Sequence, residues 1–220
     1  MLDTRLTVVY KRRMAHAHVL SAAQFGQLLE HVAHVSAAPL RDYAVLLLSF
    51  KGGLRAQEIV GLRWRDVMDA RGGVGDTFTI PRAATKKRYA REVPMHPTLK
   101  ATLEHLHAYS APCNAPYYPI IRAIEAYTDP RAAAVSGSDR QHLRSAALRV
   151  YLKRIYDDAG FTGCSSHSGR RTFTTTALQR AGAHGCTLYD VQRVVGHRQA
   201  ETTAAYVESS PAFAQLVRGL

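Results

Sequence analysis

Cysteine is scarce in this chain, whose 220 residues contain three, at Cys113, Cys164 and Cys186. The number is odd and no two of them form a Cys-x-x-Cys pair, so a disulfide framework is not expected and reduced thiols fit the cytoplasm. The chain also lacks any apolar run near the roughly eighteen residues that span a bilayer, and no long apolar stretch follows the charges at its N-terminus. We therefore expect a soluble cytoplasmic protein with no membrane partner.

Acidic residues are also few, since 17 Asp and Glu face 29 Lys and Arg and leave a formal net charge of +12. A balance this basic, with a pI of about 10.0, indicates a polyanionic partner, and nucleic acid is the first candidate. With 46% hydrophobic residues, the chain has enough apolar material to bury the core of one large or two small domains. Overall disorder is therefore not expected.

The spacing of apolar residues predicts a mainly helical chain with one β-hairpin. Ser21 and Gln24 form a capping box, and Phe25, Leu28, Leu29 and Val32 follow at helical spacing, so a helix is expected to begin at Ser21. Between Thr77 and Met95 the period changes to two, which predicts a small antiparallel hairpin. The further helices are expected at about 40–51, 54–64, 99–106, 142–159, 168–180, 187–195 and 202–208. These elements predict an α+β fold that is mainly α-helical.

The basic residues are concentrated in three places. Residues 82–91 and 140–154 each contain five Lys or Arg and no acid, and residues 1–20 are also basic with little apolar pattern. We expect a basic N-terminal arm over 1–20 and a single domain over 21–220. A basic hairpin tip and a basic helix could follow a phosphate backbone, although a run of charges is more often an ordinary solvated surface.

Four separated motifs carry side chains suited to phosphate chemistry. They are Gly53-Leu54-Arg55-x-x-Glu58, a lysine ahead of the strand that ends in Val93-Pro94, His167-x-x-Arg170, and Gly196-His197 followed by Thr202-Thr203-x-x-Tyr206. Three of the four have a simpler interpretation when taken alone. The first is an i, i+3 ion pair, the third is a capped helix start, and the tyrosine is a half-buried aromatic residue.

Together and in this order, the motifs resemble the tyrosine recombinase family, also called phage integrases, from Ser21 to the end of the chain. The resemblance implies a helical catalytic domain with a small antiparallel sheet, acting on double-stranded DNA without a metal or other cofactor. It implies catalytic roles for Arg55, Lys86, His167, Arg170, His197 and Tyr206 and a supporting role for Glu58. Lys86 is preferred to Lys87 because it lies eight residues before Pro94, as the catalytic lysine of the family usually does. The residues expected to bind DNA are Lys87, Arg88, Arg91, Arg140 and Arg144.

The chemistry of such an enzyme explains why these residue types are needed. Two arginines would hold the non-bridging oxygens of a phosphodiester, where negative charge grows during attack. Tyr206 would lose its proton to His167 and form a 3′-phosphotyrosyl intermediate, while Lys86 would protonate the departing 5′ oxygen. The resemblance further implies a homotetramer on DNA, assembled through the C-terminal tail that carries Phe213, Leu216 and Val217.

Other functions stay open at this stage. A type IB topoisomerase shares these residues, and a non-catalytic DNA-binding remnant could regulate a full-length recombinase. A zinc site at Cys164, His167, His184 and Cys186 is weaker because neither spacing fits the usual patterns. A serine hydrolase using Ser166 or Ser168 lacks the Gly-x-Ser-x-Gly elbow.

The sequence departs from the family in three respects. Only about 20 residues precede the expected catalytic domain, so the usual N-terminal core-binding domain is expected to be absent or truncated. Residues 112–130 match no part of the family pattern, and Ser168 follows His167 where Asp is common. These departures bear on DNA affinity and site selection more than on bond cleavage.

Overall fold

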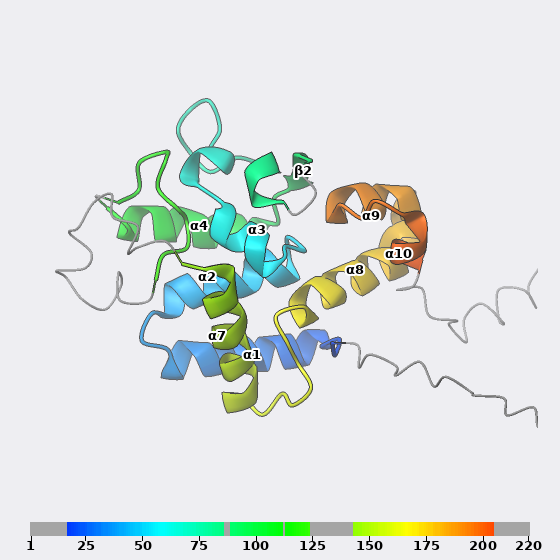
Figure 1. Ribbon diagram of the computed structural model, residues 1–220, viewed down its shortest axis with the longest axis horizontal. Helices are drawn as coiled ribbons and strands as arrows, with labels where there is room; N and C mark the ends of the chain where they lie inside the picture. The colour runs from blue at the N-terminus through cyan, green and yellow to red at the C-terminus, as the bar shows by residue number, and fades with distance from the viewer. Residues whose placement is uncertain (1–16, 86–88, 112, 124–142, 205–220) are drawn as a thin grey trace, which may run out of the picture.

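The structure is a computed structural model that describes residues 17–85, 89–111, 113–123 and 143–204. Figure 1 shows a group of helices with the strand β2 near the top of the view, and α8 leading outward from the centre to α9 and α10. The α-helices are α1 (Ala22–Val35), α2 (Pro39–Phe50), α3 (Ala56–Gly61), α4 (Pro97–Tyr109), α7 (Ser145–Asp158), α8 (Ser168–Ala181), α9 (Leu188–Val195) and α10 (Ala200–Ala204). Short 3₁₀ helices are η1 (Trp64–Asp66), η2 (Arg82–Ala84) and η4 (Gly182–His184).

Helix α1 begins as its sequence predicts, because Ser21 and Gln24 form a reciprocal capping box. Most expected helices are confirmed to within a few residues, including α2, which ends at Phe50 just before Gly52 and Gly53. The helix expected from residue 142 begins at Ser145, and the one expected over 54–64 divides into α3 and η1. Only α10 is described within the expected helix over 202–208, because residues 205–208 lie outside the described part.

The predicted hairpin is confirmed as a two-stranded antiparallel sheet of β1 (Thr77–Ile80) and β2 (Arg91–Pro94). Phe78 pairs with Val93 and Ile80 pairs with Arg91 in its register. Because directly paired residues point to the same face of a sheet, the side chain of Arg91 shares the inward face with buried Ile80 and Val93. This orientation determines the role of Arg91 described below.

The main core surrounds α2, which is buried along most of its length and packs against α1, α4 and α8. Leu20 is also part of this core, and its backbone N–H donates to the hydroxyl of Thr172 at 3.0 Å. The described residues that precede α1 therefore pack on α8, whereas residues 1–16 of the expected basic arm lie outside the described part. A smaller apolar cluster joins α8 to α9 through Ala181, Val191 and Val195.

Close backbone contact between α2 and α8 requires a glycine. A Cβ atom placed on Gly169 would lie 2.3 Å from the hydroxyl oxygen of Ser49, which is far inside contact distance. This approach positions the start of α8, and with it the His167-x-x-Arg170 motif, directly against α2. None of the helices in the described part of the chain has both the length and the apolar character that a membrane span requires.

Candidate active site

Arg55 and Glu58 form the first part of the site, at the start of α3. The backbone N–H of Arg55 donates to Oε2 of Glu58 at 2.8 Å, and its Nη1 donates to Oε1 at 3.1 Å. This is the local ion pair that the i, i+3 spacing predicts. The carboxylate is buried, yet about 35% of the Arg55 side chain stays exposed, so its guanidinium can meet a ligand from solvent.

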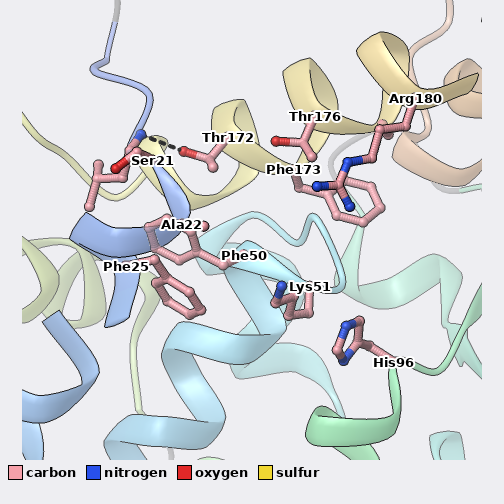
Figure 2. Close-up of a pocket in the computed structure, with 12 residues that line it drawn as sticks. Ser21, Ala22, Phe25, Phe50, Lys51, His96, Thr172, Phe173, Thr176 and Arg180 are labelled. Carbon is pink, nitrogen blue, oxygen red and sulfur yellow. Dashed lines mark hydrogen bonds between the residues drawn. The ribbon is translucent and has the colours of Figure 1, made fainter. Parts of the chain in front are cut away.

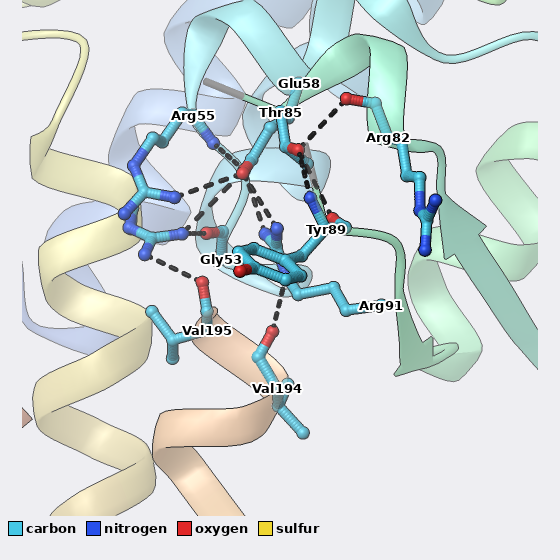
Figure 3. Close-up of polar contacts among 10 residues, drawn as sticks. Gly53, Arg55, Glu58, Arg82, Thr85, Tyr89, Arg91, Val194 and Val195 are labelled. Atoms are coloured by element: carbon cyan, nitrogen blue, oxygen red, sulfur yellow. Dashed lines mark hydrogen bonds and ion pairs between the residues drawn. The ribbon is translucent and has the colours of Figure 1, made fainter. Parts of the chain in front are cut away.

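Arg170 brings α8 and α9 to the same place. Its side chain is only 3% exposed, and its Nη1 donates to the carbonyl oxygen of Gly53 at 2.7 Å while its Nη2 donates to that of Val195 at 2.8 Å. Nη1 also lies 3.8 Å from Oε2 of Glu58. Figure 3 shows how these bonds gather three distant parts of the chain around one carboxylate. Arg170 is therefore fixed in position beside Arg55.

Gly53 makes the approach of α8 possible. Its φ of +68° lies in the left-handed region, and a Cβ atom there would lie 2.5 Å from the ring of Phe173. A side chain would strain the backbone and collide with the aromatic ring one turn after Arg170. The glycine of the Gly-Leu-Arg motif thus serves both the turn before α3 and the packing of α8.

Glu58 is held ionised at the centre of the cluster. Burial alone raises the pKa of its carboxyl group, but hydrogen bonds and charge from Arg91, with contributions from Arg55 and Arg170, outweigh burial and lower the pKa overall. Three guanidinium groups thus face one carboxylate, and the cluster keeps an excess of positive charge. An excess of this kind suits a site that receives a phosphate.

His197 follows α9 and is held by backbone and side-chain bonds. Its backbone carbonyl accepts from Nε2 of Gln192 at 3.1 Å, and its Nδ1 shares a hydrogen bond of 3.0 Å with the hydroxyl of Thr203 in α10. Burial, followed by the charges of Arg170, Arg55 and Arg91, lowers the pKa of His197 to about 4. The imidazole is therefore neutral at pH 7 and has a fixed orientation.

His167 lies at the N-cap of α8, three residues before Arg170. Its backbone N–H donates to the hydroxyl of Ser165 at 3.2 Å, and its ring lies at the surface of the site. Partial desolvation, and then the charges of Arg170 and Arg55, lower the pKa of this histidine too. A neutral imidazole at neutral pH can accept a proton.

The side chain of Arg91 points inward, although its place in a basic run predicted an exposed position. Its side chain is 9% exposed, and its Nη1 and Nη2 donate to the two oxygens of Glu58 at 2.8 and 2.9 Å. Its Nε donates to the carbonyl oxygen of Val194 at 2.9 Å. The expectation that Arg91 binds DNA is thus replaced by an inward position, because the register of the hairpin turns it toward the core.

Other predicted residues are placed only in part. Arg144 is exposed just before α7. Tyr206 and four of the basic residues lie outside the described part of the chain, namely Lys86, Lys87, Arg88 and Arg140. The structure therefore brings together Arg55, Glu58, Arg170 and His197, with His167 beside Arg170 in the chain.

The proposed zinc ligands do not come together. Cys164 is buried, whereas Cys186 is exposed near the start of α9. Across residues 17–85, 89–111, 113–123 and 143–204, no group of three or more His, Cys, Asp or Glu side chains is arranged to hold a metal ion. His167 is therefore not part of a cysteine–histidine cluster.

Two hollows border α8, and neither is lined by Arg55, Arg91 or Arg170. One of about 270 Å³ is bordered by Lys51, His96 and Arg180, as Figure 2 shows. The other, a mostly apolar groove of about 430 Å³, runs between β2, α8 and α9. None of the residues predicted for catalysis lines either hollow. An open cluster of arginines is better suited than a closed cavity to a phosphate on a large duplex.

Sequence reasoning missed two contributors to this geometry. Thr203 belongs to the Thr-Thr-x-x-Tyr motif, but nothing in its spacing showed a bond to His197. Arg91 carried a usable signal, because it alternates with Glu92 and shares the parity of Val93, which is an inward position in a strand. The period-two pattern of the strand therefore predicts an inward arginine. It is a more specific signal than the run of basic residues, which predicted a DNA contact.

Comparison with known proteins shows which family the chain resembles. The model of the phage integrase family matches residues 18–212. A tyrosine recombinase XerC from Nitrobacter winogradskyi is 29% identical over 167 residues, which cover 76% of this chain and 45% of that protein. The chain thus spans about half the length of the curated relatives it matches.

Solved structures show the same fold at low identity. The integrase of the transposon Tn1549, in complex with circular intermediate DNA, has a TM-score of 0.69 at 15% identity, covering 99% of this chain and 72% of that chain. The catalytic domain of bacteriophage HP1 integrase has a TM-score of 0.57 at 16% identity, covering 91% and 92% respectively. Since the family model covers most of the sequence and the fold agrees, this chain belongs to the phage integrase family.

Proposed function

We propose that the chain is the catalytic part of a site-specific recombinase that cleaves and rejoins DNA strands through Tyr206. The observation that supports this most directly is the meeting of Arg55, Arg170 and His197 around Glu58, although they come from three separate motifs. The XerC relatives are named tyrosine recombinases, and the Tn1549 integrase was solved with DNA. A DNA strand transferase of this family is expected to have relatives of both kinds.

In the proposed step, Oη of Tyr206 attacks the phosphorus of one phosphodiester and the bond to the 5′ oxygen breaks. The tyrosine proton passes to His167, and Lys86 supplies the proton that the departing 5′ oxygen needs. The products are a 3′-phosphotyrosyl bond and a free 5′-hydroxyl group. Because the new bond is still a phosphodiester, a 5′-hydroxyl group from another strand can reverse the step without an added energy source.

The described residues would stabilise the transition state of that step. Arg55, with about a third of its side chain exposed, and Arg170, fixed by two carbonyl oxygens, can approach the same phosphate. If the Thr203 hydroxyl donates to Nδ1 of His197, the ring proton is on Nε2, which can then donate to a phosphate oxygen. Fixed donors at a site of growing negative charge are a strong source of rate enhancement.

The test is covalent capture on nicked DNA duplexes of randomised sequence, in which release of a short strand traps the cleaved state. We expect a protein–DNA adduct with the native chain and none with Tyr206→Phe. Tyr189→Phe is the matched control, because Tyr189 is an exposed tyrosine of α9, and it should keep the adduct. An adduct that persists in Tyr206→Phe would remove the nucleophile assignment.

The two other functions predict different outcomes. A chain that binds DNA but forms no adduct on any duplex would be a non-catalytic remnant. Relaxation of supercoiled plasmid without sequence preference would indicate a type IB topoisomerase. Recombination requires instead that strands from two duplexes be exchanged, which a two-plasmid assay measures directly.

We further propose that the chain assembles as a tetramer on DNA through the C-terminal tail containing Phe213, Leu216 and Val217. The apolar groove between β2, α8 and α9 offers a surface on which an apolar segment of a second copy could dock. Deletion of residues 210–220 should preserve DNA binding by single copies of the chain. It should abolish the complexes in which several copies bind one DNA, as a native gel would show. Unchanged complexes after this deletion would contradict the proposal.

A further inference from the structure

Arg91 makes more connections than its place in a basic hairpin requires. Its guanidinium joins three elements, since it lies on β2, donates to both oxygens of Glu58 in α3, and donates through Nε to Val194 in α9. The paired bonds to Glu58 have the bidentate geometry that gives arginine–carboxylate contacts their strength and direction. All three nitrogen atoms of its guanidinium therefore already donate to acceptors within the protein.

The second feature is the C-terminal end of α9, where backbone carbonyl groups have no partner within the helix. Arg91 donates to the carbonyl of Val194, and Arg170 donates to that of Val195. Two guanidinium groups therefore bind the negative end of the helix, where positive charge is stabilising. His197 lies two residues after Val195, so these bonds fix the stretch of chain that presents its imidazole.

Gly196, between that helix end and His197, gives Arg91 the space to lie there. Gly196 has a φ of +72°, and a Cβ atom on it would lie 3.0 Å from Cδ and 3.1 Å from Nε of Arg91. The left-handed conformation ends α9, while the missing side chain lets the arginine cross the backbone. The glycine of the Gly-His motif and Arg91 thus depend on one another.

The third feature is the balance of charge around Glu58. Arg91 binds both carboxylate oxygens at 2.8 and 2.9 Å, whereas Arg55 reaches one at 3.1 Å and Arg170 lies 3.8 Å away. Arg91 is thus the arginine closest to the carboxylate and the one that binds both of its oxygens. Its charge offsets that of Glu58, so Arg55 and Arg170 keep their own positive charge for a ligand.

We propose that Arg91 is a positioning residue that fixes the α9 end carrying His197 and offsets the charge of Glu58, leaving Arg55 and Arg170 available to the phosphate. This inference rests on the proposed function of the cluster. Arg91 itself touches neither DNA nor the reacting atoms. The proposal distinguishes Arg91 from Arg144, which is exposed and expected to contact the DNA backbone.

The first test compares DNA binding with adduct formation on the nicked duplexes. Arg91→Met should keep the native salt dependence of binding and slow adduct formation at saturating DNA by about tenfold or more. Arg144→Met, which removes an exposed arginine expected to contact DNA, should reduce the slope of log K against log salt by about 0.9 and so shows what the loss of one phosphate contact looks like. If Arg91→Met reduces the slope as Arg144→Met does and keeps its rate, Arg91 is a DNA contact and the proposal is wrong.

The second test separates charge balance from simple loss of packing. Adding Glu58→Gln to Arg91→Met removes the uncompensated carboxylate and restores the excess of positive charge, so the double variant should form adduct faster than Arg91→Met alone. A purely structural role predicts that the second substitution adds further damage. If the double variant forms adduct no faster than Arg91→Met, the proposal that Arg91 offsets the charge of Glu58 is wrong.

The third test does not depend on cleavage. Amide hydrogen exchange in Arg91→Met should be faster at Gly196 and His197, whose N–H groups donate to Gln192 at 2.8 and 3.2 Å, while α1 stays unchanged. If the methionine variant does not fold, Arg91→Lys keeps the charge and should show a smaller change at the same amides. Unchanged exchange at the Gly196 and His197 amides would overturn the positioning role. If the native chain forms no adduct, the proposed function is refuted. The hydrogen-exchange measurement then decides the role of Arg91 by itself.

Discussion

The pKa of His197, held near 4, predicts that acid weakens the folded state through this one side chain. An unfolded histidine titrates near 6.5, whereas burial and the neighbouring arginines lower the folded pKa to about 4. Between these values the unfolded chain binds the proton more readily than the folded chain does, so stability falls as pH decreases. The effect begins near pH 6.5 and is complete below about pH 4.

The size of this effect follows from the two pKa values. Between pH 7 and pH 5 the linkage relation gives a loss of about 2 kcal/mol from His197 alone. A loss of this size is a large fraction of the stability of an ordinary domain, which is about 5–15 kcal/mol. Other titrating groups add their own dependence, so the contribution of His197 must be measured as a difference between variants.

The assay is urea unfolding followed by circular dichroism, at pH 7 and pH 5, for the native chain and His197→Gln. We expect the variant to lose about 2 kcal/mol less than the native chain over this interval. His105→Gln removes an exposed histidine from α4 and controls for the loss of one imidazole. Equal losses in the native chain and His197→Gln would refute the reasoning that burial and the arginine cluster hold this ring neutral.

Three further predictions test packing, backbone conformation and DNA contact. Gly169→Ala should destabilise the fold by about 1–3 kcal/mol in urea unfolding, because the new methyl group collides with α2. Its control is Gly26→Ala, which adds a methyl group in open space on α1 and should stabilise the fold by about 0.5–1 kcal/mol. Gly196→Ala should cost about 1–3 kcal/mol through its positive φ and displace Arg91, and should therefore reduce adduct formation more than DNA binding. Arg144→Ala should lower affinity for duplex DNA more at low salt than at high salt, as titrations at several salt concentrations would show.

Local spacing explains why much of the fold was predictable. The capping box at Ser21 and the Arg55–Glu58 pair join residues three apart, so the contacts are fixed by helix geometry once a helix forms. The hairpin was predicted because its alternation has a period that no helix shares. The side chains expected to bind phosphate were identified as residue types in four motifs, and the structure places Arg55, Arg170 and His197 together.

The sequence by itself determined most of the elements, the charge and the residue types of the four motifs, whereas the tertiary structure decided what each arginine binds. Arg91 lay in a run of basic residues, but the pairing of Ile80 with Arg91 turned it inward to Glu58. The partners of Arg170 are carbonyl oxygens of Gly53 and Val195, which any residue type could supply. Backbone oxygens leave no signature in a sequence, and contacts across more than a hundred residues exist only when helices pack, so their geometry had to come from the fold.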